Sequence, residues 1–90
     1  MLNAIIINPH DTVVTVTTAI KKGEAVSYAS CKKAITARTD IPVYHKVAIK
    51  KANKGEKIYK YGEVIGYATK DIEIGEHVHT HNLGSEKIDK

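Results

Sequence analysis

Apolar and polar residues alternate in short runs along the chain, and β-branched residues dominate the apolar positions. This period of two is typical of strands that place alternate side chains in a core. It predicts strands near residues 4–7, 13–17, 25–28, 46–49, 58–61, 63–68 and 77–81. Helical periodicity is weak, so we expect only one or two short helical turns, within residues 18–22, 30–37 or 71–75. The pattern therefore predicts a small, mostly β domain.

Three turns with a shared pattern separate these strands. Each places a Gly-Glu pair two residues before a β-branched aliphatic residue, at Gly23-Glu24, Gly55-Glu56 and Gly75-Glu76. Glycine readily adopts the positive φ angle of a tight turn, and the aliphatic residue then starts a strand by entering the core. We therefore expect short strands connected by tight turns.

The composition indicates one small domain that depends on association. Ninety residues, 42% of them hydrophobic, are close to the lower limit for a self-sufficient core. We expect a single domain over residues 1–90, with residues 84–90 as a flexible tail. Phe and Trp are absent, so Ile, Val and Ala must form the core. A chain of this size builds no large cleft alone, which favours a partner subunit or a homo-oligomer.

The net charge of +4 comes from lysines spread through the chain, with acidic residues among them and a single arginine. Nucleic-acid-binding proteins usually gather arginine and aromatic residues on one face, so this class is disfavoured. A mildly basic surface that attracts small carboxylates fits the composition better.

The single cysteine, Cys31, excludes an internal disulfide and a cysteine-rich zinc site. Residues 1–9 include an apolar run, but it lacks the basic start of a signal peptide and the length of a membrane span. These features predict a cytoplasmic protein without a membrane anchor.

Candidate chemistry concentrates in His77, His79 and His81, which occupy alternate positions of the last predicted strand. In an extended strand their side chains share one side, but alternate residues lie about 6.5–7 Å apart, so the three span about 13 Å. One ion cannot reach all three on a straight strand. The alternative is a row of exposed histidines that bind substrate anions or form a polar face.

A metal site would therefore need ligands from elsewhere. We expect two of the three histidines to converge, with Glu76, His10 or His45 completing the site. Histidine and carboxylate ligands with open positions suit iron(II), and another divalent metal is an alternative.

His45 and Lys46 are candidate substrate-binding residues at the start of a predicted core strand. Lys46 could bind a substrate carboxylate as a point charge. The simpler interpretation is a solvated lysine beside a hydrogen-bonded histidine.

Three stretches carry a family resemblance: IPVYHKVAI at residues 41–49, GEKIYKYGEVIGYA at 55–68 and DIEIGEHVHTHNL at 71–83. They resemble the amino-terminal, SAF-type domain of the altronate and galactarate dehydratase family. The resemblance covers about residues 8–83, and the histidine run after Gly-Glu is its most specific part. In that family the domain is fused to a large catalytic region or forms a separate small subunit, as in altronate dehydratases and (2R)-sulfolactate sulfo-lyase.

The resemblance implies a β-clip fold and the small subunit of a lyase, with iron(II) as cofactor and a large catalytic subunit as partner. The substrate would be a sugar acid or related 2-hydroxy acid such as altronate or galactarate. Elimination removes a proton beside a carboxylate and expels a poor leaving group, which a Lewis acid and a general acid assist. His77, His79 and His81 would line the shared catalytic site.

Alternative functions are a sulfolactate-type sulfo-lyase subunit, a non-catalytic SAF-type module that binds carbohydrate or protein, and a protein for metal storage or delivery. The chain also departs from the family at Tyr44-His45-Lys46, where many members read Gly-His-Lys. This departure predicts that the backbone at Tyr44 need not adopt a conformation restricted to glycine.

Overall fold

The computed structural model describes residues 2–29 and 34–85, which form nine strands and no helix. The strands are β1 (Ala4–Ile5), β2 (Val13–Val16), β3 (Ala25–Val26), β4 (Ile35–Thr36), β5 (Lys46–Ala48), β6 (Lys57–Lys60), β7 (Glu63–Ala68), β8 (His77–Val78) and β9 (Leu83–Gly84). The mostly β fold class is confirmed. Within these ranges, no helix is long and apolar enough to cross a membrane.

The expected helical turns are absent from the described residues. Isolated bridges join Ile20 to Ile41 and Ala52 to Ile72, so residues 18–22 and 71–75 form bends, bridges and turns instead. Part of the third segment is strand β4, while residues 30–33, with Cys31, lie outside the described residues. Strands β4 and β9 were not predicted, because neither of these two-residue strands lies in a longer alternating run of the kind that indicated strands at 4–7, 25–28 and 77–81.

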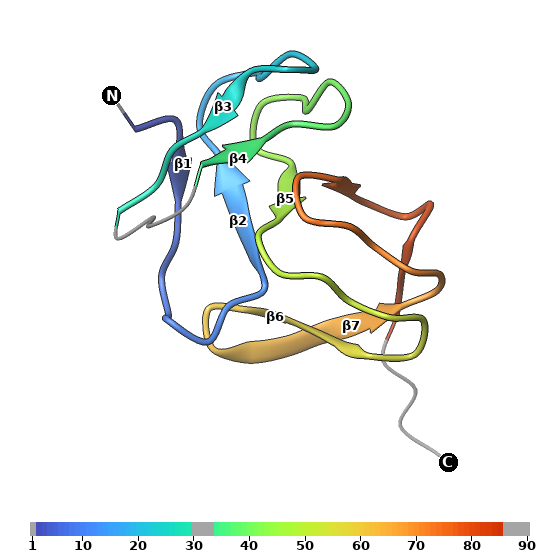
Figure 1. Ribbon diagram of the computed structural model, residues 1–90. Coiled ribbons are helices and arrows are strands. Elements are labelled where there is room, and N and C mark those ends of the chain that lie inside the picture. The colour runs from blue at the N-terminus through green and yellow to red at the C-terminus, as the bar shows by residue number, and fades with distance from the viewer. Residues whose placement is uncertain (1, 30–33, 86–90) are drawn as a thin grey trace.

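A central antiparallel sheet with the order β1-β2-β5-β8 organises the molecule. The β3-β4 hairpin lies at one end, and the sheet β6-β7-β9 lies at the other, as Figure 1 shows with β3 and β4 at the top and β6 and β7 along the bottom. The predicted strand 63–68 matches β7. The predicted strand 58–61 corresponds to β6, which is shifted by one residue toward the N-terminus, and the remaining predicted strands start as expected but end earlier.

Alternate residues of the central sheet face two separate cores. Val14 and Val47, paired across β2 and β5, pack in the first core. Their neighbours Val13 and Ala48, also paired, pack in the second. Every buried apolar side chain in the described parts of the chain is Ile, Val or Ala, as the composition predicted. The central sheet is thus covered on both faces, which fixes its register.

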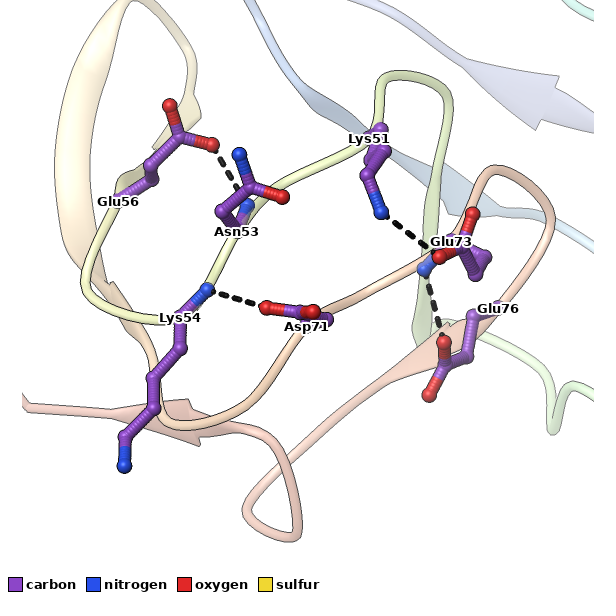
Figure 2. Close-up of polar contacts among 7 residues, drawn as sticks. All are labelled: Lys51, Asn53, Lys54, Glu56, Asp71, Glu73 and Glu76. Carbon is purple, nitrogen blue, oxygen red and sulfur yellow. Dashed lines mark hydrogen bonds and ion pairs between the residues drawn. The ribbon is translucent and has the colours of Figure 1, made fainter.

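Each Gly-Glu turn is closed by its own glutamate. The glycine has a φ angle of 91–92°, the value expected at the third position of a type II turn. The glutamate carboxylate accepts the N–H of the first turn residue, from Lys21 to Glu24 at 2.8 Å, Asn53 to Glu56 at 2.6 Å, and Glu73 to Glu76 at 2.9 Å. Figure 2 shows the last two turns, with Asp71 accepting the N–H of Lys54 between them.

A fourth turn, over residues 42–45, has the same geometry with Tyr44 in place of glycine. In the other three, the glycine N–H donates to an alanine carbonyl, and the glutamate carbonyl accepts that alanine's N–H. Here the Tyr44 N–H donates to Val16 and the His45 carbonyl accepts the Val16 N–H, both at 2.9 Å. Tyr44 has a φ angle of 68°. The pairing holds Tyr44 in the left-handed region, which a residue with a side chain can adopt at a cost, and not at the larger φ angle of the three glycines.

The β6-β7 turn is anchored by a buried carboxylate. Asp11, 1% exposed, accepts the N–H of Gly62 at 2.7 Å and that of Asn8 at 3.2 Å. Burial raises the pKa of Asp11, but hydrogen bonds from Gly62, Tyr61, Asn8 and Ile7 outweigh it, and the pKa falls below its usual 3.8. The carboxylate therefore remains charged and holds two distant loops together.

Candidate functional site

Three histidines in or next to two paired strands form a compact cluster. His45 precedes β5, His77 starts β8, and His79 follows β8. One nitrogen from each ring lies within 4.8 Å of the others. The His45 and His77 rings are hydrogen-bonded, with Nδ1 of His45 2.9 Å from Nε2 of His77. We call these three residues the histidine cluster.

The cluster forms because β5 and β8 pair antiparallel. Val47 lies opposite His77, so His45, two residues before Val47, shares the face of His77. The ring of His45 lies 5.1 Å from that of His77 and 4.6 Å from that of His79, between centroids. The rings of His77 and His79 are nearly parallel, at 7° and 5.7 Å.

The predicted strand 77–81 is wrong beyond Val78. The chain turns after β8, where the N–H groups of Asn82 and Leu83 both donate to the His79 carbonyl, at 3.0 and 2.8 Å. Because of this turn His79 does not continue along the axis of β8, so the spacing of a straight strand does not separate His79 from the other rings. His81 is exposed, and its ring centroid lies 5.4 Å from that of His77.

Asn82 holds this turn, and its role could not be read from the histidine pattern. Its side chain is fully buried. Its amide nitrogen donates to the His77 carbonyl at 2.9 Å and to a Glu76 carboxylate oxygen at 3.4 Å, and its oxygen accepts the His79 N–H at 3.0 Å. The only signal in the sequence is the preference of asparagine for turns, where its side chain bonds nearby backbone groups.

The other candidate residues lie outside the cluster. Both carboxylate oxygens of Glu76 accept hydrogen bonds, from Glu73 and Asn82, so this side chain closes the turn before β8. His10 is exposed and borders a separate hollow with Asn8, Thr12, Tyr59 and Gly62.

Lys46 is half-buried on the opposite face of β5 from His45, by strand alternation. Burial, with a smaller contribution from the charge of Lys60, lowers the pKa of Lys46.

The electrostatics of the site favour a neutral imidazole at His77. Burial lowers the pKa of His77 most, and the neighbouring His45, His81, His79 and Lys46 lower it further. The bond between the His45 and His77 rings requires one nitrogen to donate and the other to accept. A neutral imidazole is the form of histidine that binds a metal ion.

The cluster lies on an open surface. His45 and His77 are half-buried, whereas His79 is exposed. Two hollows formed by the described residues lie elsewhere: the one beside His10, and one lined by residues that include Thr12, Lys50, Lys57 and Tyr59. Neither hollow encloses the cluster, and its imidazoles are of the chemical type that ligates small metal ions.

Comparison with known proteins gives one family match and similarity to two kinds of lyase. The family model for the altronate/galactarate dehydratase SAF domain matches residues 2–86. The chain is 47% identical over 53 residues to (2R)-sulfolactate sulfo-lyase subunit alpha of Paracoccus pantotrophus, which covers 59% of this chain and 79% of that subunit. It is 38% identical over 82 residues to altronate dehydratase of Bacillus subtilis strain 168, covering 91% of this chain.

The matched region is only 16% of the Bacillus dehydratase, so most of that enzyme has no counterpart here. A second sulfo-lyase alpha subunit, from Chromohalobacter salexigens, is 40% identical over 47 residues, covering 52% of this chain and 50% of that subunit. Because the family model matches almost the whole chain, the protein belongs to the altronate/galactarate dehydratase SAF domain family.

Proposed function

We propose that this chain is the small subunit of a lyase that eliminates water, or a similar leaving group, from a sugar acid or related 2-hydroxy acid. Catalysis takes place with a large catalytic subunit, and the histidine cluster lies at the site that the two share. The observation that carries the proposal is the cluster itself: three imidazoles gathered on an open face of a domain whose relatives are lyases. The altronate-type and sulfolactate-type reactions are the two substrate classes that these relatives support.

The donor set fits a divalent metal such as iron(II). Two nitrogens bound at about 2.1 Å to one ion lie about 3.0–4.2 Å apart, depending on the angle between them. The cluster nitrogens, all within 4.8 Å of one another, need only a small contraction to reach this range. Imidazole suits iron, zinc and related ions, and three protein ligands leave positions open for substrate.

The residues of the chain have distinct roles in this proposal. A bound divalent ion would supply Lewis-acid polarisation of the substrate oxygens. His45, His77 and His79 would hold it through neutral ring nitrogens. His81, beside His77, is placed to exchange a proton with a bound substrate or leaving group. Exclusion of water must come from the large subunit, because the cluster is open.

A separate subunit is supported by the similarity to the sulfo-lyase alpha subunit. The matched segment covers 79% of that subunit, against 16% of the dehydratase. The name of the relative states that it is one subunit of its enzyme.

Reconstitution tests this proposal. The chain is purified anaerobically with the large lyase chain of the same organism, and each is assayed alone and together with iron(II). Altronate, galactarate and sulfolactate are offered as substrates. We expect neither chain to be active alone and the mixture to release a 2-keto product. A large chain that is fully active without this domain would contradict a catalytic role and support a binding module.

Replacing Asn82 by alanine is expected to lower metal affinity about 10- to 100-fold, the effect typical of losing a residue that orients metal ligands. It leaves the His77 carbonyl and the His79 N–H without their side-chain partner, at a cost to stability of about 3 kcal/mol. Metal content and chemical unfolding are measured on the same samples.

The matched control is Ile20→Ala, a buried substitution of similar cost to stability in the first core, which contains no residue of β8 or of the turn after it. A positioning role predicts that only Asn82→Ala loses metal affinity. Equal losses of metal affinity in both variants would mean that Asn82 has only a structural role.

A further inference from the structure

Tyr44 has a strained backbone. Its φ angle of 68° lies in the left-handed region, which is unfavourable for a residue with a side chain. The equivalent position in the three Gly-Glu turns is glycine, at φ angles of 91–92°. A glycine at residue 44 would make the same backbone bonds to Val16 without this cost.

The side chain of Tyr44 is mostly exposed in the described structure. It is 73% exposed, and among residues 2–29 and 34–85 its ring makes no hydrogen bond or ring contact. The other strained tyrosine differs. Tyr61 occupies a two-residue hairpin turn with Gly62, where positive φ is required at both positions, and Lys60 Nζ lies 4.6 Å from its ring centre.

Tyr44 also lies directly beside the histidine cluster. It precedes His45 in the chain, and Val43 on its other side is 43% exposed, so two exposed apolar residues are adjacent in sequence to the cluster. Backbone strain beside a candidate site, not offset by a side-chain hydrogen bond or ring contact of the described residues, is the kind of outlier that motivates a functional hypothesis. Tyrosine is among the residues that dominate the energy of protein interfaces.

We propose that Tyr44 is the anchor by which this domain docks onto the large catalytic lyase chain, closing the open side of the histidine cluster. This inference rests on the proposed function. The occupant follows from the comparisons, since the matched domain makes up 16% of the Bacillus dehydratase and the remaining polypeptide is covalently joined to it. A docked catalytic chain would cover an apolar pair beside the histidines and exclude water from the site.

The test measures association and stability together. Binding of the large lyase chain to this chain is followed by calorimetry, and the Tm of this chain alone is recorded. Tyr44→Gly is expected to raise the Tm by about 5 °C, because it removes the backbone strain. The same variant is expected to weaken association at least about tenfold, because it removes the anchor. Opposite changes in stability and binding are the signature of this proposal.

Two further variants separate the ring from the backbone. Tyr44→Phe keeps the aromatic ring and is expected to bind the large chain as the unaltered protein does. Tyr44→Ala keeps the strain and removes the ring, so it weakens association without raising the Tm. Tyr61→Gly is the matched control: it relaxes the other strained tyrosine, away from the cluster, and leaves association unchanged.

The outcomes distinguish this inference from the proposed function. If the unaltered chain does not bind the large lyase chain at all, both are overturned. If it binds and Tyr44→Gly binds equally well, only the role of Tyr44 is overturned. A Tyr44→Gly complex that assembles normally but has a raised KM would assign the ring to the substrate and also overturn the docking role.

Discussion

Replacing His77 by alanine is expected to reduce metal affinity and lyase activity of the assembled enzyme by about 100-fold or more. His77 is central to the site, because its ring is hydrogen-bonded to His45, parallel to His79 and close to His81. Loss of a residue that merely orients a ligand costs 10- to 100-fold, so loss of a ligand should cost at least as much. Iron content after anaerobic dialysis and kcat/KM are the quantities to measure.

His10→Ala is the matched control for His77→Ala. His10 is an exposed histidine that borders a separate hollow, so its removal should change neither metal content nor activity. His45→Ala should reproduce the loss seen for His77→Ala. A His77→Ala enzyme with full iron content and unchanged kcat/KM would disprove the metal-binding role of the cluster.

Gly75→Ala is expected to destabilise the chain by about 4 kcal/mol, near the upper end for single substitutions. Gly75 is buried, with a φ angle of 91°, and a Cβ there would collide with the carbonyl oxygen of Thr36. The Thr36 carbonyl belongs to the backbone, so it cannot move aside as easily as a flexible side chain could. The strand β8 starts two residues later, so the collision also displaces His77. Urea unfolding of the purified variant measures the change.

Gly55→Ala separates the two causes of this loss. Gly55 has nearly the same φ angle, 92°, but nothing lies within 4 Å of a Cβ added there. Gly55→Ala should therefore cost only the left-handed backbone penalty, about 1–2 kcal/mol. Equal losses at both positions would mean that the contact with Thr36 does not restrict residue 75.

Local patterns predicted the fold class and the turns well. The mostly β architecture follows from β-branched residues at alternate positions, and all three Gly-Glu turns have the positive φ angle that glycine permits. The Ile, Val and Ala core follows from the absence of larger apolar aromatics. These features depend on residues close in sequence, which is why the sequence reveals them.

The features that depend on long-range pairing could not be predicted in the same way. His45 and His77 are 32 residues apart in the sequence, and the register of β5 against β8 brings them together. The turn that carries His79 back depends on the buried amide of Asn82. Glu76, considered as a metal ligand, closes its own turn, because the N–H of Glu73 lies within reach of its carboxylate.

Tyr44 shows the limit of reasoning from residue type alone. A tyrosine in place of glycine predicts only that the backbone need not be restricted to glycine, and the pairing of its turn with Val16 holds Tyr44 at a φ angle of 68°, in the left-handed region. Tertiary hydrogen bonding outweighs the local preference of the residue.

Anomalous diffraction at the iron edge, from crystals of the active complex grown without oxygen, is the most direct test of the histidine cluster as a metal site. We predict one strong anomalous peak within bonding distance of His45, His77 and His79. A peak held entirely by the large chain, with the three imidazoles bound to no metal in an enzyme that turns over substrate, would contradict the account.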